Sequence, residues 1–266
     1  SVAAPSFYGF VDIEFMPGNT NVIYAVTKDF GNASPYKSID GGANWTLIDS
    51  GLLPDRDNAE IAVTADNPNV IYALFTSSGE YHGLYKSINM GDAWTLQSDT
   101  PDIIIRQGSY NLSLAVDPTN EANVWAGGIQ QNNSIDNGQN WNINYGNANT
   151  GYVHVDQHFA DFNLITNTLF VANDGGIYKY LGGTNWDMIS DGLEITEFYK
   201  LGLSKNNPDR LVAGSQDNGT SMLDNGLWNN IFGADGMECA IDPYDDDIIY
   251  ITIQGGKFFK SFNGGS

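Results

Sequence analysis

Short apolar runs alternate with polar positions along the whole chain, and turn-forming residues bound each run. Residues 70–75 (Val-Ile-Tyr-Ala-Leu-Phe) and 248–252 (Ile-Ile-Tyr-Ile-Thr) are two such runs, rich in β-branched and aromatic side chains. Runs of this kind between Gly, Asn, Asp and Pro are typical of short strands joined by tight turns. No window shows sustained helical periodicity. The pattern therefore predicts an all-β chain.

One order of features recurs along the chain at a nearly constant period. The Trp residues that close successive copies are 49, 47, 45 and 42 residues apart, and they are Trp45, Trp94, Trp141, Trp186 and Trp228. A period of roughly 40–50 residues with strand-like content is the signature of one blade of a β-propeller. We expect a β-propeller of four-stranded blades with about six blades visible, at residues 11–50, 59–99, 111–146, 157–190, 199–232 and 239–266.

The sixth copy of the repeat ends before its Trp. A propeller closes its ring because closure hides the hydrogen-bonding edges of its sheets. We therefore expect residues 1–266 to form a single propeller domain that is part of a seven-bladed or larger propeller. The partners of this domain would then include flanking domains of the same longer chain.

The loop before the Trp carries a recurrent polar pattern, Ser-x-Asp-x-Gly-x-x-Trp. The three clearest copies are Ser38, Asp40, Gly42 and Trp45; Ser87, Asn89, Gly91 and Trp94; and Ser134, Asp136, Gly138 and Trp141. The Asp or Asn oxygen can accept hydrogen bonds from nearby backbone N–H groups and close the turn, while the glycine takes a positive φ. The Trp then packs between neighbouring sheets. We predict that these residues are structural.

The charge of the chain narrows the range of partners. Eleven Lys and Arg residues stand against 32 Asp and Glu, which gives a formal net charge of −21. Binding to a phosphate backbone or an anionic membrane surface requires basic side chains, so neither nucleic acid nor such a surface is expected as a partner. No apolar run has the length of a membrane span, so direct membrane insertion is not expected. The acidity suits a saline or extracellular setting.

The first candidate for chemistry is a short His/Asp segment. His154, Asp156 and His158 stand at positions i, i+2 and i+4, and on a strand these three side chains would share one face. Imidazoles and a carboxylate are good ligands for a transition metal. The same strip fits a polar channel lining that holds water, because a straight strand spaces alternate side chains about 7 Å apart. Both interpretations stay open.

Further polar residues follow the second strand of several copies. Antiparallel pairing puts the start of a first strand beside the end of the second, so these residues should gather at one mouth of the central channel. The expected group is His154, Asp156, His158, Asp174, Gln216, Asp217, Asp235 and Glu238. A pair of its carboxylates could catalyse glycoside hydrolysis. The carboxylates could equally bind Ca²⁺, which is the candidate cofactor, or form hydrogen bonds with a sugar. Asp-Gly and Asn-Gly also occur simply as turn dipeptides.

The repeated Ser-x-Asp-x-Gly-x-x-Trp pattern resembles the Asp-box (bacterial neuraminidase) repeat over nearly the whole chain. In that family the boxes are structural, whereas sialidase activity uses three arginines, one in a Phe/Tyr-Arg-Ile-Pro motif, and a Tyr–Glu pair. The arginines of this chain are Arg56, Arg106 and Arg210, and none lies in that motif. The resemblance therefore implies the fold, and sialidase activity is not expected.

Four other segments resemble the sortilin-like and xyloglucanase-like propellers of secreted Bacteroidota proteins, many of them type IX secretion substrates. These segments are residues 153–158, 172–178, 214–219 and 235–243. In xyloglucan-active hydrolases a catalytic Asp lies in an Asp-x-Gly-Gly-x-Tyr turn, and its partner lies in a second propeller. Asp174 in Asn-Asp-Gly-Gly-Ile-Tyr matches that turn with one residue fewer.

These observations favour a non-catalytic recognition or adhesion module of a secreted or cell-surface protein. It would bind a glycan or an extracellular protein at the propeller mouth. One alternative is a xyloglucanase-like glycoside hydrolase, with Asp174 and either Asp217 or Asp235 as acid and base. The other alternative is a structural repeat domain that spaces other modules. The missing sialidase residues and the lack of a firm acid–base pair favour the first interpretation.

Overall fold

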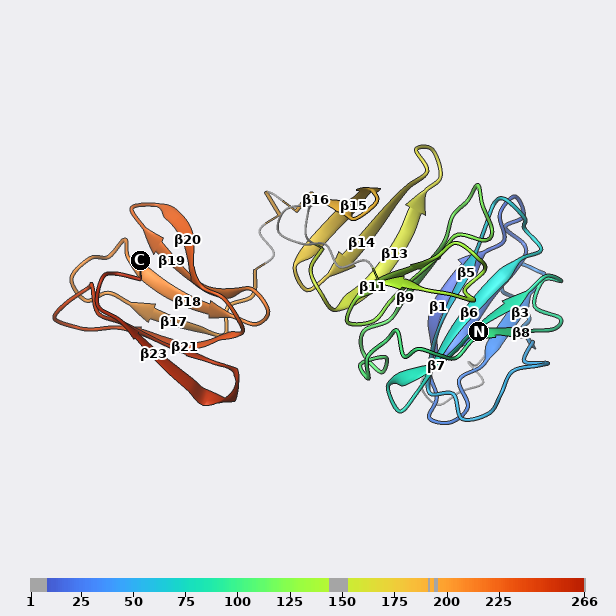
Figure 1. Cartoon of the computed structure of the whole chain (residues 1–266), viewed down its shortest axis with the longest axis horizontal. Helices are drawn as coiled ribbons and strands as arrows, with labels where there is room; N and C mark the ends of the chain where they lie inside the picture. The colour runs from blue at the N-terminus through green and yellow to red at the C-terminus, as the bar shows by residue number, and fades with distance from the viewer. Residues whose placement is uncertain (1–8, 144–152, 191, 194–195, 266) are drawn as a thin grey trace. The chain divides into compact units, whose positions relative to one another are not determined.

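The computed structural model describes residues 9–143, 153–190, 192–193 and 196–265. Within them the regular elements are short β-strands and one 3₁₀ turn at Gln254–Gly256 (Figure 1). The prediction of an all-β chain is therefore confirmed. Residues 144–146 at the end of the third predicted blade, Gly151 and Tyr152 ahead of the His/Asp segment, and Ser266 at the end of the last copy lie outside the described residues.

The strands form antiparallel sheets in which strands adjacent in sequence pair. Five sheets have four strands and the sixth has three, each in simple chain order from one edge to the other. The first four sheets contain β1 (Phe10–Phe15), β2 (Ile23–Thr27), β3 (Pro35–Ser38), β4 (Thr46–Leu47), β5 (Asn58–Val63), β6 (Ile71–Ser77), β7 (Glu80–Ser87), β8 (Thr95–Ser98), β9 (Ser113–Val116), β10 (Val124–Gly127), β11 (Gln131–Ser134), β12 (Asn142–Ile143), β13 (Gln157–Asn163), β14 (Thr168–Asn173), β15 (Gly176–Gly182) and β16 (Asn185–Met188). The last two contain β17 (Lys200–Leu203), β18 (Leu211–Ser215), β19 (Gly219–Asp224), β20 (Leu227–Phe232), β21 (Gly236–Ile241), β22 (Ile249–Ile253) and β23 (Lys257–Ser261). A four-stranded antiparallel meander is the blade of a β-propeller, so the predicted fold class is confirmed.

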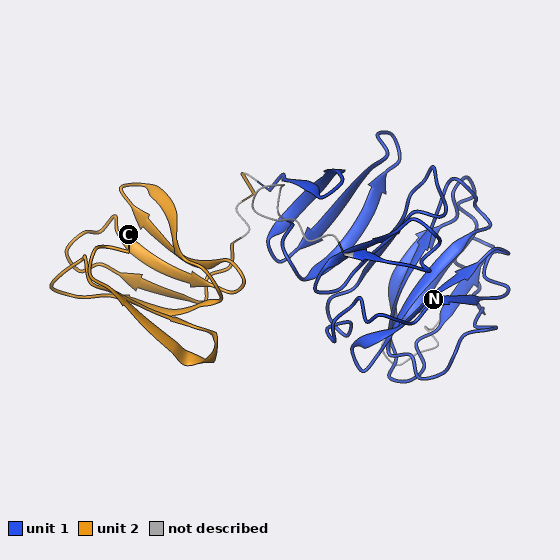
Figure 2. Ribbon diagram, viewed as in Figure 1, with its two compact units in different colours: residues 1–190 blue, residues 191–266 orange. Residues whose placement is uncertain are grey.

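The chain divides into two compact units (Figure 2), of which the first comprises Ser1–Ser190 and carries the first four sheets. In this unit the first strands of successive sheets touch, since β1 contacts β5, β5 contacts β9, and β9 contacts β13. The second strands form much of the core: every side chain of β2 is buried, and so is every side chain of β6 except the last. A run that is buried at each position fits a strand covered on both faces, as the inner strands of packed blades are.

The second unit comprises Asp191–Ser266 and carries the last two sheets. Here β17 and β18 both contact β21. The core of this unit includes Val212, Ile241 and Ile249 together with Cys239, which is a buried free thiol. That the two units belong to one propeller ring stays a prediction.

The Ser-x-Asp/Asn-x-Gly segments, the box turns, close in the same way in the first three copies. In the second copy Ser87 Oγ donates to Asn89 Oδ1 at 2.8 Å and accepts the Gly91 N–H at 2.9 Å. Gly91 has φ +85°, a conformation that costs glycine little. In the first copy, hydrogen bonds from Asn44 lower the pKa of Asp40 to about 2. Local side-chain hydrogen bonds therefore close each turn, and a backbone hydrogen bond such as that from the Met90 N–H to the Asn69 carbonyl at 2.9 Å ties the turn to an earlier loop.

Two of the repeated Trp residues, Trp94 and Trp141, join neighbouring sheets. The buried Trp94 of the second sheet donates its Nε1–H to the Ile48 carbonyl at 2.6 Å, and its backbone N–H donates to the Ser50 carbonyl at 2.9 Å. In the third copy Trp141 donates its Nε1–H to Ser98 Oγ at 3.0 Å. Each of these two indoles thus buries its apolar body against the preceding sheet while its polar N–H is satisfied.

Candidate functional site

The structure changes the interpretation of the His/Asp segment. His154 and Asp156 lie ahead of β13, which begins at Gln157. Asp156 has φ +64°, so the chain turns there and the alternation of side chains along a strand does not extend back to it. The expectation that His154, Asp156 and His158 share one strand face is therefore wrong. Metal binding by these residues stays a prediction without that argument.

His158 instead meets Asp174. In the pairing of β13 with β14, Gln157 faces Asn173 and Phe159 faces Ala172, so His158 is the extra residue of a β-bulge. A bulge re-aims the side chain that it inserts. His158 Nε2 lies 2.6 Å from Asp174 Oδ1 in the turn between β14 and β15, where antiparallel pairing puts the two strand ends. The two side chains are 32% and 26% exposed, so solvent reaches both.

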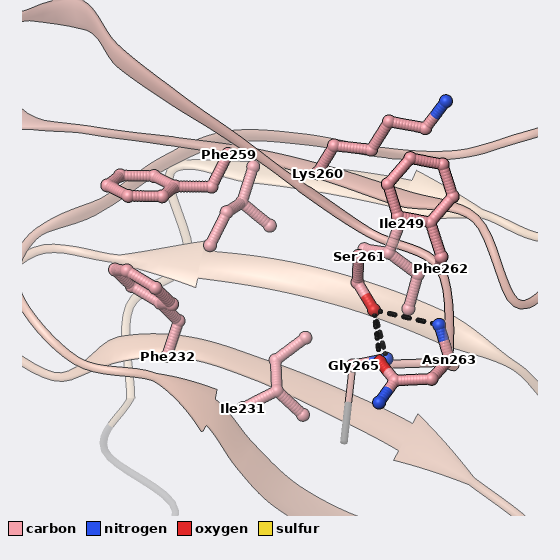
Figure 3. A pocket seen from close by; sticks show the side chains of 10 residues that line it. Ile231, Phe232, Ile249, Phe259, Lys260, Ser261, Phe262, Asn263 and Gly265 are labelled. Carbon is pink, nitrogen blue, oxygen red and sulfur yellow. Dashed lines mark hydrogen bonds between the residues drawn. The ribbon is translucent and has the colours of Figure 1, made fainter.

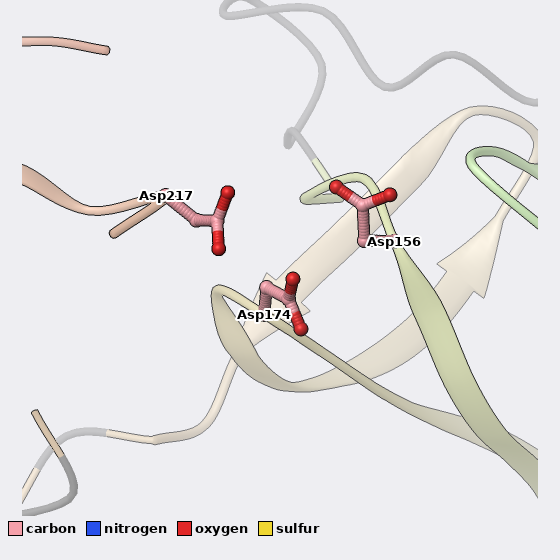
Figure 4. A group of neighbouring side chains, drawn as sticks. All are labelled: Asp156, Asp174 and Asp217. Atoms are coloured by element: carbon pink, nitrogen blue, oxygen red, sulfur yellow. The ribbon is translucent and has the colours of Figure 1, made fainter. Parts of the chain in front are cut away.

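Asp156 lies beside Asp174 (Figure 4). One of its carboxylate oxygens lies within 4.8 Å of a carboxylate oxygen of Asp174. The Asn111 side chain donates to Asp156 Oδ1 at 2.5 Å. Burial raises the pKa of Asp156 and the nearby Asp174 raises it further, while His154, His158 and Asn111 act in the opposite direction. Asp156 and Asp174 are therefore two neighbouring carboxylates with different hydrogen-bond partners, Asn111 for the first and His158 for the second.

Backbone contacts fix the loop that carries Asp156. The Asp156 N–H donates to the Ile129 carbonyl at 2.8 Å. The side chains of Gln157 and Asn173 both donate to the His154 carbonyl, at 2.6 and 3.1 Å. These groups hold the segment before they meet any ligand, which lowers the entropy lost on binding.

Gly175 shapes the same turn. A Cβ at Gly175 would lie 2.4 Å from His154 Cβ, closer than any side chain tolerates. The turn after β14 therefore approaches the His/Asp segment only because this position is glycine. The sequence pattern Asp-Gly-Gly is thus needed for packing as well as for turning.

Sequence reasoning missed two residues of this group. Tyr110 is 76% exposed, and its ring is nearly perpendicular to that of His158, with centroids 5.1 Å apart. Asn111 is buried, and its side chain donates to Asp156. Both precede β9, and the prediction that first-strand starts gather at one mouth could have included them. We call Tyr110, Asn111, Asp156, His158 and Asp174 the carboxylate site.

The remaining candidates lie in the second unit. The Asp217 N–H donates to Asp235 Oδ1 at 3.1 Å, and the Tyr199 hydroxyl bonds the Gln216 side chain. Glu238 lies on β21, where its backbone N–H donates to Thr252 Oγ1 at 3.0 Å. Tyr199 and Glu238 also line a small cavity of about 340 Å³. A single ring that joins these residues to the carboxylate site stays a prediction.

A second set of acids in the first unit was also missed. Glu14 on β1 and Glu60 on β5 lie on first strands that touch one another. Burial raises the pKa of Glu14 to about 8, and the charges of Asp12 and Asp161 add to the effect. Burial also raises the pKa of Glu60 well above its usual range, with Asp12 again contributing. We call Asp12, Glu14 and Glu60 the inner-strand acids.

Solved structures with the same type of fold cover nearly all of this chain. The GH74 xyloglucanase from Xanthomonas campestris matches 97% of it at 17% identity and a TM-score of 0.51, over 44% of its own chain. PorZ, an essential surface component of the type-IX secretion system of Porphyromonas gingivalis, matches 98% at 14% identity and a TM-score of 0.50, over 34% of its own chain. YCF48 bound to a D1 peptide matches 99% at 14% identity and a TM-score of 0.50, over 82% of its own chain.

These similarities support the propeller-type fold and nothing finer. No profile of a known protein family matches the chain, and no curated protein matches it in sequence. The chain spans less than half the length of the xyloglucanase and PorZ structures. No helix in the described part of the chain is long and apolar enough to cross a membrane.

Proposed function

We propose that this chain is a propeller of Asp-box repeats in a secreted or cell-surface protein, and that it binds a glycan without catalysis. The observation that carries the proposal is the carboxylate site. It combines two fixed carboxylates, Asp156 and Asp174, with the exposed ring of Tyr110. Binding sites for small ligands combine a few precisely placed hydrogen-bonding groups with an apolar or aromatic surface.

Each part of the site has a role in this proposal. Asp174 and Asp156 accept hydrogen bonds from sugar hydroxyls, and their existing partners, His158 and Asn111, hold them in place. The Tyr110 ring offers an apolar face and a polar hydroxyl to the same ligand. Because these groups come from three loops already fixed by packing, little order has to be gained on binding.

The comparisons support a binding role without choosing the ligand. One protein of this fold is a bacterial surface component, another is bound to a peptide, and a third is a xyloglucanase. The net charge of −21 favours a neutral or cationic ligand over an anionic one. A neutral polysaccharide is therefore the first ligand class to test.

The test is a glycan-array and polysaccharide-hydrolysis screen on the purified chain and on two variants, Asp174→Asn and Tyr110→Ala. We expect binding to a neutral glycan without release of reducing sugar, and a loss of at least roughly tenfold in affinity in each variant. Tyr244→Ala is the matched control, because Tyr244 is 92% exposed in the second unit. Binding that is unchanged in both site variants would contradict this location.

The second candidate function is glycoside hydrolysis, and one observation favours it. Asp156 has a raised pKa and one of its oxygens lies within 4.8 Å of an Asp174 oxygen, so the two could act as general acid and nucleophile of a retaining hydrolase. Asp217 and Asp235 remain the other proposed partners of Asp174. Release of oligosaccharides that is abolished by Asp174→Asn would establish this function in place of recognition. A chain that neither binds nor hydrolyses any glycan or peptide would leave the structural spacer as its role.

A further inference from the structure

A groove of about 710 Å³ lies in the first unit, between the first and second sheets. Most of its lining comes from β3, the first box turn and β4, and Asp92 follows the box turn of the second copy. Both sheets contain four strands, so the groove lies between two whole blades. The lining side chains of interest are Ile39, Asp40, Leu47, Asp49 and Asp92.

Lys37 is the one basic side chain among the described residues that line the groove, and it is already paired. Its Nζ donates to Asp92 Oδ1 at 2.6 Å and to the Met90 carbonyl at 3.0 Å. The Lys37 side chain is 15% exposed, whereas that of Asp92 is 67% exposed. Lys37 therefore ties the two sheets together and leaves much of the Asp92 carboxylate in solvent.

The other two carboxylates of the groove lack a cationic hydrogen-bond partner. Asp40 accepts hydrogen bonds from the backbone and side chain of Asn44, at 2.9 and 2.7 Å. These neutral donors lower the pKa of Asp40 to about 2, so it stays charged. Asp49 is exposed, and its carboxylate accepts no hydrogen bond from any described residue. The groove thus holds three carboxylates and one ammonium group that is bound to one of them.

The box turn adds an apolar side chain to these charges. In every well-formed turn the residue after the serine is large, apolar and about 70% exposed: Ile39 is 71%, Ile88 72%, Ile135 68% and Phe262 70% exposed. Figure 3 shows the last of these turns, in which Ser261 Oγ donates to Asn263 Oδ1 at 2.8 Å and accepts the Gly265 N–H at 2.9 Å. In the groove, Ile39 is joined by Leu47, which is 47% exposed.

The equivalent place between the second and third sheets has the same turns without these acids. Counted from the Ser, Trp and Gly of each copy, the counterparts of Asp40, Asp49 and Asp92 are Asn89, Ser98 and Gln139. The turn around Asn89 nevertheless closes in the same way as the turn around Asp40. The fold therefore does not require carboxylates at these positions, and their concentration beside exposed apolar side chains points to a ligand.

We propose that this groove binds a basic segment of a partner protein in which lysine or arginine residues flank an apolar side chain. The apolar side chain packs against Ile39 and Leu47, and the basic groups pair with Asp40, Asp49 and the exposed part of Asp92. Charge complementarity favours such a segment over an acidic one, and the exposed apolar surface favours it over a small cation. The groove shares no residue with the carboxylate site, so this interaction does not depend on glycan binding.

The test uses a fluorescently labelled peptide, Gly-Arg-Leu-Arg-Leu-Arg-Gly, and a second peptide in which serine replaces both leucines. Titration with the full chain should give saturable binding of the leucine peptide by fluorescence anisotropy. The serine peptide should bind at least roughly fivefold more weakly, because it has the same charge but no apolar side chain to bury. Binding should also weaken severalfold between about 0.05 and 0.5 M NaCl, since the ion pairs lie at the surface.

Two double variants with the same change in charge and apolar surface locate the site. Ile39→Ser with Asp49→Asn should weaken binding of the leucine peptide by at least roughly fivefold. Ile88→Ser with Asp187→Asn should leave it within about twofold, because Ile88 occupies the same turn position one copy later and Asp187 is exposed on β16. Circular dichroism melts show whether each variant remains folded, and the comparison of the two peptides needs no variant.

Three results would overturn the proposal. The first is the absence of saturable binding of the leucine peptide to the unaltered chain. The second is equal binding of the leucine and serine peptides, which would mean attraction to the net negative charge alone. The third is an equal effect of the two double variants, which would place the peptide elsewhere on the molecule.

Discussion

The first unit holds two groups of acidic side chains that differ in their partners. In the carboxylate site, His158 contacts Asp174 at 2.6 Å and Asn111 donates to Asp156 at 2.5 Å. Around the inner-strand acids, the charged groups that shift the pKa of Glu14 and Glu60 are other carboxylates. Position in the repeat separates them, since the first group lies on loops and strand ends and the second within first strands.

The difference shows what each group is suited to do. A carboxylate supplied with donors stays available as a fixed acceptor, and such acceptors are what a ligand site needs. Burial and the neighbouring carboxylates raise the pKa of Glu14 and Glu60, so these two carboxyls remain neutral until the pH is high enough to force a charge into a crowded, partly buried place. The inner-strand acids should therefore govern how stability depends on pH, whereas the carboxylate site should govern binding.

The largest expected effect is a loss of stability as pH rises. A carboxyl whose pKa is raised on folding holds a proton that the unfolded chain has already released above about pH 4.5, so the free energy of unfolding falls as pH rises. For Glu14, with a pKa of about 8, the fall spans the interval from 4.5 to about 8. Glu14→Gln should remove about 2 kcal/mol of this fall, after allowance for partial exposure to solvent.

Urea denaturation at several values between about pH 5.5 and pH 9 measures this effect. Asp187→Asn is the control, because Asp187 is exposed on β16 and should leave the slope of stability against pH unchanged. If the free energy of unfolding depends on pH in the same way in Glu14→Gln and in the unaltered chain, the inner-strand acids do not govern the pH dependence of stability, and the proposed difference between the two acidic groups is wrong.

A smaller effect on stability is expected in the carboxylate site. Asp156→Asn keeps an oxygen that can accept from Asn111 and removes a charge that burial and Asp174 disfavour. The free energy of unfolding should therefore change by about 1 kcal/mol or less, in the stabilising direction. Glycan binding should nevertheless weaken in the same variant. Calorimetry with the bound glycan measures the affinity, and a stability loss above about 3 kcal/mol would mark Asp156 as a structural residue instead.

The fold could be predicted because each blade is specified locally. The alternating runs, the box turns and the Trp spacing all lie within about 50 residues of one another, and each repeats. The bonds of Ser87 to Asn89 and Gly91 are contacts between residues two and four positions apart. Short-range patterns of this kind can be recognised in a single sequence.

The site was predicted only in part because its geometry depends on backbone detail and on neighbouring sheets. Antiparallel pairing was enough to anticipate that the start of β13 lies near the end of β14. The left-handed Asp156 and the bulge at His158 leave no clear mark in the sequence, so the shared strand face was predicted wrongly. Asn111 is 45 residues from its partner Asp156, and the blade period alone does not give that contact.

The inner-strand acids did leave a signal that was not used. Asp12 and Glu14 alternate with Val11, Ile13 and Phe15 along β1. Side chains at alternate positions of a strand point to the same side, so Asp12 and Glu14 lie on one face of β1. Because the first strand of each blade lines the central channel of a propeller, this alternation predicts that both acids lie together near the channel.

The smallest expected effect concerns calcium at the carboxylate site. Oxygens of Asp156 and Asp174 that lie within 4.8 Å of each other can both reach one Ca²⁺ ion, since Ca–O distances are about 2.3–2.6 Å. With a dissociation constant near the millimolar range of extracellular sites, about 1 mM Ca²⁺ would stabilise the fold by only about 0.4 kcal/mol.

The measurement is the midpoint of thermal unfolding in Ca²⁺, in chelator and in Mg²⁺. The shift should occur with Ca²⁺ alone, vanish in Asp174→Asn and persist in Glu14→Gln, because calcium would act on one acidic group and not on the other. A shift that survives Asp174→Asn and disappears in Glu14→Gln would assign the ion to the inner-strand acids and reverse the division of roles between the two groups.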